Sequence, residues 1–140
     1  RFALWESTCA MIQDRWVFGV GWGSYFLANP AYNFFMEDSR IIIYHAHDMY
    51  HSMAAEIGIP GALCFFLFFF GQGVLGWHLY KKGRDCFNRS LGLGMFLTVT
   101  AMAVEGLGDY VFFSRAVSLC FWGMAALSSS CWAAEKKNKN

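Results

Sequence analysis

Residues 57–80 read IGIPGALCFFLFFFGQGVLGWHLY and contain no Asp, Glu, Lys or Arg. A helix of about 20 apolar residues is long enough to cross the hydrocarbon core of a bilayer. Two further apolar runs follow. Residues 91–108 contain one acid near the end of the run, and residues 116–134 contain no charged residue. Soluble core helices rarely occur as three such runs in succession, so the sequence predicts three transmembrane helices.

The composition also fits a membrane protein. Of the 140 residues, 56% are apolar and 15% are charged, against about 25% charged residues in an ordinary soluble domain. The five cysteines show no CxxC pair or zinc-site spacing, and they predict no disulfide framework. Because the sequence begins at Arg1 with no signal peptide, we expect the C-terminal part of a longer chain. The expected fold class is therefore all-α and integral to the membrane: three transmembrane helices plus an extracytoplasmic helical loop, as a fragment of a larger multi-span bundle.

The sorting of charges predicts an orientation. The loop KKGRDCFNRS at 81–90 holds four cations and one acid, and the tail EKKNKN at 135–140 holds three cations and one acid. By the positive-inside rule both face the cytoplasm. No basic stripe interleaves with aromatic residues, so no nucleic-acid partner is expected. The predicted segments are an extracytoplasmic loop segment with short helices (1–56), a transmembrane helix (57–80), a cytoplasmic loop (81–90), a transmembrane helix (91–108), an outer turn (109–115), a transmembrane helix (116–134) and a cytoplasmic tail (135–140).

The outer segment carries charges too often to span a bilayer. Residues 2–16 have the apolar spacing of an amphipathic helix. Residues 24–43 are predicted to form a loop, since Asn29-Pro30 is a turn signal. Residues 44–57 then predict a short helix, which Gly58 ends before the long span begins.

A polar cluster, His45-Ala46-His47-Asp48-Met49-Tyr50-His51, precedes this span and is followed by Glu56. Three interpretations remain open. In the first, His47 and His51, four residues apart, share a face and bind a metal. In the second, the histidines are solvated side chains of an interfacial helix. In the third, one of them acts in acid–base chemistry. Histidine suits the third role because its ordinary pKa lies near physiological pH.

Several stretches resemble the O-antigen ligase and polymerase family. They are RFALWESTCAMIQD followed by GVGWGSYF, then HAHDMYHSMAAEIGIPG leading into a membrane helix, and EGLGDYVFFSR before a Phe-Trp-Gly helix. The family pattern has a His, then usually Asn, Ser or Gln, then nine residues and Gly. This sequence resembles that pattern at His47, Asp48 and Gly58, but it has Asp48 where the family usually has an amide or hydroxyl residue.

The resemblance implies a membrane glycosyltransferase that moves a glycan from an undecaprenyl-diphosphate carrier to a hydroxyl acceptor, in lipopolysaccharide or other polysaccharide biosynthesis. It implies His47 as the general base and Arg1, at the family's loop arginine position, as the cation on the diphosphate. Arg40, His45 and Glu56 are the expected substrate-binding residues. Neither metal nor other cofactor is expected. Arginine is the natural phosphate partner where no metal neutralises the leaving group.

Ligase, polymerase and protein O-oligosaccharyltransferase remain alternatives, with lipid A core, a glycan or a protein as acceptor. The expected location is the bacterial inner membrane, with residues 1–56 periplasmic, the C-terminus cytoplasmic and the lipid bilayer as a partner. A function of another class is a non-catalytic transporter or sensor fragment whose His-rich segment titrates. The spans contain few polar residues, whereas a proton or ion pathway normally places ionisable groups at membrane depth.

Overall fold

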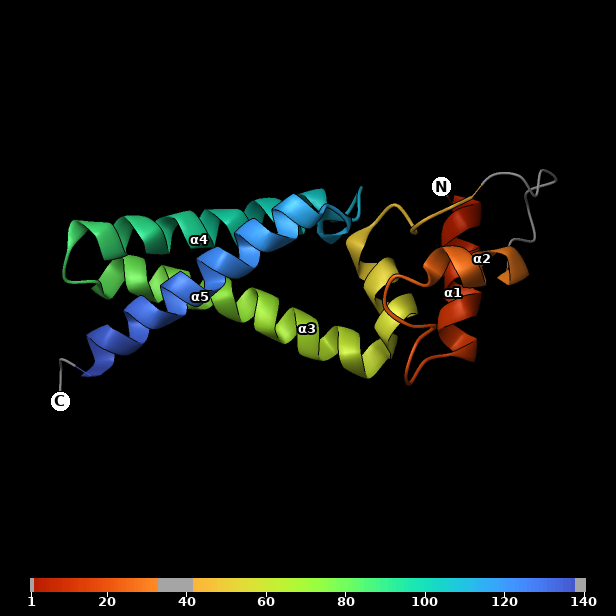
Figure 1. Cartoon of the computed structure of the whole chain (residues 1–140), viewed down its shortest axis with the longest axis horizontal. Helices are drawn as coiled ribbons and strands as arrows, with labels where there is room; N and C mark the ends of the chain where they lie inside the picture. Colours follow the sequence, from red (N-terminus) through yellow and green to blue (C-terminus); the bar gives the residue numbers. More distant parts are fainter. Residues whose placement is uncertain (1, 33–41, 138–140) are drawn as a thin grey trace. The chain divides into compact units, whose positions relative to one another are not determined.

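The computed structural model describes residues 2–32 and 42–137. Within these ranges the secondary structure is entirely helical, as predicted (Figure 1). The chain divides into two compact units, residues 1–65 with 105–111 and residues 66–104 with 112–140. The helices, in order, are α1 (Phe2–Asp14), α2 (Tyr25–Tyr32), α3 (Met49–Lys82), α4 (Cys86–Glu105), the short 3-10 helix η1 (Val111–Phe113) and α5 (Arg115–Lys137).

The first unit has a small core built from α1, α2 and the start of α3. Met11, Tyr25, Ala46 and Ala55 are fully buried and pack together. The Thr8 hydroxyl and the Tyr25 phenol lie 2.6 Å apart, so this buried polar pair is satisfied within the core. The unit therefore combines segments of residues 1–65 around one compact centre.

The predicted loop over residues 24–43 is wrong for its first part, because α2 is a helix that contains Pro30. Tyr25, Ala28, Asn29 and Tyr32 all face inward, and this is the i, i+3, i+4, i+7 spacing of an apolar helix face. Burial of that face outweighs the backbone hydrogen bond that Pro30 cannot make.

Helix α3 is interrupted at Gly58, whose φ of 74° and ψ of 169° are not helical. A Cβ atom at this position would overlap the carbonyl oxygen of Val17. Glycine is needed for both reasons, since it adopts positive φ freely and lets another backbone approach closely. The short helix predicted over residues 44–57 thus begins later, at Met49, and its predicted end at Gly58 is a break within a longer helix.

We expect Gly58→Ala to be strongly destabilising. A φ of 74° with a ψ of 169° is a conformation essentially restricted to glycine and costs an alanine about 1–3 kcal/mol, and relief of the overlap with Val17 adds a packing cost of about 1–3 kcal/mol. Gly23→Ala is the matched control, because Gly23 has a φ of 69° while no described atom lies within 4 Å of its Cβ position. Thermal unfolding in detergent should show the larger loss at Gly58. Equal losses would mean that the close approach carries no energy.

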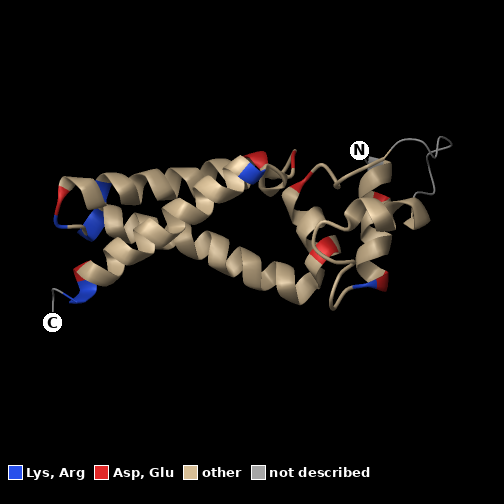
Figure 2. Ribbon diagram, in the orientation of Figure 1, with Lys and Arg blue, Asp and Glu red and all other residues tan. Residues whose placement is uncertain are grey.

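The second unit holds most of the apolar sequence. In the described part of the chain, three helices are long and apolar enough to cross a membrane: α3, α4 and α5. This confirms the three predicted transmembrane helices. Figure 2 shows lysine and arginine gathered where α3 meets α4 and where α5 ends, with long uncharged stretches of the same helices between the charged ends. The protein is therefore a multi-pass membrane protein.

Close backbone contact and aromatic packing hold this unit together. Gly76 and Gly92 bring α3 and α4 into contact, since a Cβ atom on Gly76 would lie 2.8 Å from the carbonyl oxygen of Gly92. The rings of Phe69 and Phe121 lie 5.5 Å apart and join α3 to α5. Small residues and dispersion contacts of this kind are the usual basis of helix packing in membranes.

The predicted loop 81–90 is shorter in the structure, because α4 already begins at Cys86. Asp85 caps this helix by accepting a hydrogen bond from the Asn88 N–H at 2.6 Å. Glu135, near the end of α5, accepts a hydrogen bond from the Arg84 N–H at 2.7 Å. The helix ends of the second unit are thus tied together by charged side chains.

Candidate functional site

The segment before α3 is held on both sides of Ala46. Its N–H donates to the Ser52 hydroxyl at 3.1 Å, and its carbonyl accepts a hydrogen bond from the Trp5 indole N–H at 3.1 Å. Ala46 itself is fully buried. Because side chains next to a buried residue project outward here, His45 is half-buried and His47 is exposed.

His47 adopts a left-handed backbone conformation with a φ of 56°. Histidine, asparagine and aspartate accept this conformation more readily than most residues. It turns the chain directly into α3, where Asp48 is the N-cap and accepts a hydrogen bond from the His51 N–H at 2.7 Å. The His51 ring nitrogen Nδ1 lies 3.0 Å from the same carboxylate oxygen. His51 is therefore engaged with the cap, and its ring stacks on Trp5 with 5.6 Å between centroids.

The position after the motif histidine thus serves as a hydrogen-bond acceptor at a helix start. Asp48 fulfils this role as an asparagine or a serine at an N-cap would. Its second oxygen, Oδ2, is buried and has no hydrogen-bond partner among the described residues. Only one acceptor oxygen is needed to cap the helix, so an aspartate at this position buries a second oxygen that the cap does not use.

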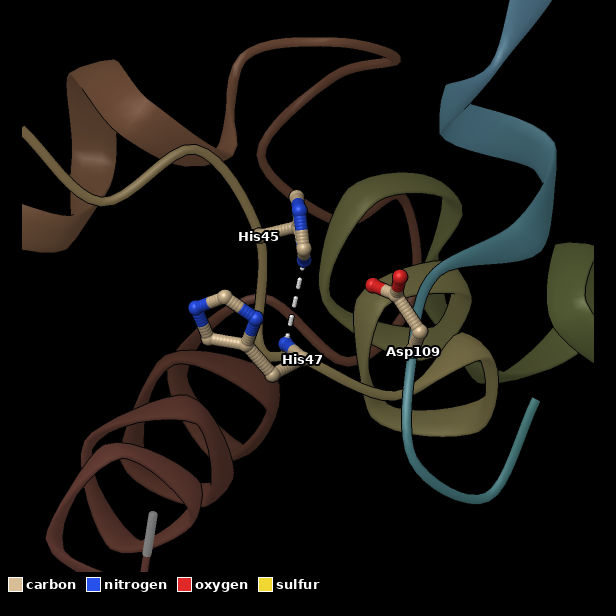
Figure 3. A group of neighbouring side chains, drawn as sticks. All are labelled: His45, His47 and Asp109. Carbon is tan, nitrogen blue, oxygen red and sulfur yellow. Dashed lines mark hydrogen bonds between the residues drawn. The ribbon is translucent and has the colours of Figure 1, made fainter. Parts of the chain in front are cut away.

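A distant turn completes the site. The carbonyl of Gly106, just after α4, accepts a hydrogen bond at 2.8 Å from the N–H of Met49, an otherwise unpaired donor at the start of α3. This docking brings Asp109 beside the two histidines (Figure 3). Among the described residues, His45, His47 and Asp109 each offer a ligand or acceptor atom within 4.8 Å of the others. We call these three residues the His–His–Asp cluster.

The hydrogen bonding of His45 defines its tautomer. Its Nδ1 accepts a hydrogen bond from the backbone N–H of His47 at 3.2 Å, drawn as a dashed line in Figure 3. A neutral imidazole that accepts at Nδ1 carries its proton on Nε2. Burial lowers the pKa of His45, and repulsion from His47 lowers it further. His45 therefore favours the neutral form in which this hydrogen bond persists.

The cluster has the ligand types of a metal site, but the tautomer opposes one. A metal ion on Nδ1 of His45 would displace the His47 N–H, and one on Nε2 would require the proton to move to Nδ1. His51, the metal partner considered for His47 from the sequence, is not among the three described residues whose ligand atoms lie together. In the arrangement described, a metal ion could use His45 only after the hydrogen bond from the His47 N–H is broken.

Glu56 is buried, with 3% of its surface exposed, and its carboxylate is held by several donors. The Tyr110 phenol donates to Oε2 at 3.3 Å, and the backbone of Gly23 and Tyr25 donates as well. Burial raises the pKa of Tyr110, and the charge of Glu56 raises it further, so the phenol remains a donor. The Tyr110 ring in turn packs edge-on against His45 at 5.9 Å. Glu56 is thereby linked to the cluster through Tyr110.

Two of the predicted site residues, Arg1 and Arg40, lie outside the described residues. The structure brings together His45 and His47 and adds Asp109, which the sequence analysis placed in the outer turn without a role. One signal pointed to Asp109: with three alternating spans, the turn at 109–115 and the His-rich segment are expected on the same side of the membrane.

The structure thus defines a class: an all-helical, multi-pass membrane protein with a histidine–carboxylate cluster at the start of its longest apolar helix. Residues 1–66 match the family Wzy_C, described as O-antigen ligase. This match confirms the resemblance seen in the sequence, and its range is nearly that of the first segment of the first unit. Searches of the curated proteins and of the solved structures gave no match.

Proposed function

We propose that this protein is part of an O-antigen ligase-like glycosyltransferase, which moves a glycan from an undecaprenyl-diphosphate carrier to a hydroxyl acceptor. The observation that carries the proposal is the family match over residues 1–66, which contain the motif histidine His47. The exposure of His47 beside His45 and Asp109 supports it further, since a general base must reach the substrate hydroxyl.

In the proposed step, an imidazole nitrogen of His47 takes the proton of the acceptor hydroxyl as its oxygen attacks the anomeric carbon of the glycan. The new C–O bond forms while the bond from that carbon to the carrier diphosphate breaks. The diphosphate leaves with the bonding electron pair. Proton transfer by a well-placed side chain contributes about 10²–10⁴-fold to such reactions.

The neighbours of His47 support this step electrostatically. Once protonated, His47 carries a positive charge that the nearby Asp109 carboxylate would stabilise. His45, whose pKa is lowered, stays neutral and adds no repulsion. We infer that His45 is a positioning residue, because its Nδ1 holds the backbone N–H of His47.

The leaving diphosphate needs a cation, and we propose Arg1 for it, with Arg40 binding phosphate or glycan. The planar guanidinium pairs with two phosphate oxygens at once. Glu56, expected from the sequence to bind substrate, has a buried carboxylate. We propose that it acts on the cluster through Tyr110 rather than by direct contact with the substrate.

The test of this function is transfer itself. The intact protein in nanodiscs is supplied with an undecaprenyl-diphosphate-linked radiolabelled glycan and lipid A core, and label on the acceptor is followed. We expect time-dependent transfer with release of undecaprenyl diphosphate. Ion or solute flux in vesicles without any transfer to lipid A core, glycan or protein acceptors would favour the transporter or sensor alternative.

We further propose the inner membrane as the location, with the His–His–Asp cluster periplasmic and the α3–α4 connection cytoplasmic. Cys9 in α1 and Cys86 at the start of α4 are both exposed, which makes them matched reporters. In single-cysteine variants, an impermeant maleimide should label Cys9 in spheroplasts and Cys86 only after permeabilisation. Labelling of Cys86 but not Cys9 in sealed spheroplasts would reverse the orientation.

A further inference from the structure

We propose that the loop 15–23, which connects α1 and α2, inserts its aromatic side chains into the surface of the lipid bilayer. Three of its large side chains are unusually exposed: Trp16 at 55%, Phe18 at 86% and Trp22 at 61%. Exposed apolar groups gathered on one loop are typical of a contact with a membrane or another molecule. The backbone contacts of the loop indicate which of these it meets.

The loop is fastened to the break in α3 by three backbone hydrogen bonds. Val20 and Gly21 donate their N–H groups to the carbonyls of Ala55 and Glu56, each at 2.9 Å, and the N–H of Ile59 donates to the carbonyl of Trp16 at 2.7 Å. The carbonyls of Ala55 and Glu56 come just before the break, and the N–H of Ile59 comes just after it. The break deprives these groups of hydrogen bonds within the helix. The loop therefore completes the hydrogen bonding of the interrupted helix.

Close packing fixes the same register. A Cβ atom on Gly19 would overlap the backbone of Glu56, just as one on Gly58 would overlap Val17. The two backbones are in direct contact at both points. The loop therefore lies at the same level along α3 as residues 55–59.

This level is the expected boundary of the bilayer. Glu56 is the last charged residue before an uncharged run that starts at Ile57 and continues to Tyr80. From Ile59 onward α3 also exposes apolar side chains, with Ile59 at 41% and Leu63 at 60% exposure. An apolar surface that faces lipid on α3 thus begins where the loop is attached.

The chemistry of the loop matches the membrane interface. Tryptophan is enriched at the level of the lipid headgroups, where the indole ring meets apolar chains and its N–H meets water. Asp14 and Arg15, next to the aromatic side chains, are exposed and can remain in the headgroup region. An open helix break at this depth would be costly in lipid, so the hydrogen bonds from the loop are needed there.

The experiment measures lipid contact directly and needs no enzymatic activity. In the intact protein with all native cysteines replaced, Phe18→Cys carries an environment-sensitive NBD fluorophore, and the protein is reconstituted in vesicles of brominated phosphatidylcholine. Gln13→Cys is the matched control, because Gln13 is exposed on α1 a short distance along the chain. A side chain inserted by about 5–10 Å lies among the acyl chains, so the label at position 18 should be strongly quenched by the bromines, while the label at position 13 should lose little.

Equal, weak quenching at both positions would overturn the proposal, whether the label at position 18 is in water or covered by protein. The unmodified protein gives an independent answer if the labelled variant does not fold. With a photoactivatable phospholipid, we expect crosslinks on the peptide that contains Trp16–Trp22 as well as on α3. Crosslinks on α3 alone would contradict the insertion of the loop.

Discussion

Replacement of His47 by asparagine should lower glycan transfer by about 10²–10⁴-fold, the usual contribution of a general base. Asparagine is the informative replacement because His47 has a φ of 56°, which asparagine adopts readily. The amide cannot take up the proton of the acceptor hydroxyl. His47→Ala would mix this loss with a backbone strain of about 1–2 kcal/mol. Initial rates at saturating donor and acceptor, together with unfolding temperature, separate the two effects.

The neighbouring histidines are the controls. Asn at position 45 keeps an oxygen near the place of Nδ1, which can still accept the His47 N–H, so His45→Asn should cost less than His45→Ala. His51→Asn should also cost less than His47→Asn, since His51 bonds to the helix cap. If the His47→Asn variant transfers glycan at a rate within a few fold of the unaltered protein, His47 is not the general base.

Arg1→Lys should lower transfer by about 10- to 100-fold, if a bidentate contact with the diphosphate is worth one or two strong charge-assisted hydrogen bonds. Lysine keeps the charge but not the planar fork of donors. The effect should appear mainly in kcat, because the charge on the leaving diphosphate develops as the glycosidic bond breaks. Steady-state rates with the lipid-linked donor measure it.

Arg15→Lys is the matched control for this change, because Arg15 is exposed just after α1 and has no proposed contact with the donor. It should leave transfer near its starting rate. If both Arg1→Lys and Arg1→Ala turn over at near-normal rates, Arg1 does not contact the diphosphate, and that role belongs to Arg40 or to residues outside this sequence.

Hydropathy and charge were sufficient to predict the membrane helices, because the thickness of a bilayer sets a long apolar run that few soluble helices have. They were less able to predict helix ends. The start of α4 at Cys86 depends on the cap that Asp85 provides, within a stretch whose charges indicated a loop. In α2, the turn signal of Pro30 obscured the inward-facing spacing of Tyr25, Ala28 and Tyr32.

The candidate site was predictable only where it is local. His45 and His47 are neighbours in sequence, and their separation from Gly58 carries the family pattern. Asp109 joins them through the docking of a turn about 60 residues away, which rests on the hydrogen bond from Met49 to Gly106. No spacing in the sequence encodes that contact. The same holds for Glu56, whose link to His45 through Tyr110 depends on the three-dimensional packing.

The central claim is that His47 acts as a base in metal-free glycan transfer. It is tested most directly by the transfer rate of chelator-treated protein, followed by stepwise addition of zinc. We predict an unchanged rate after chelation and no gain in rate when zinc is added, because the His45 Nδ1 is already engaged by the His47 N–H. Loss of transfer on chelation and its recovery with zinc would contradict the account and make the cluster a metal site.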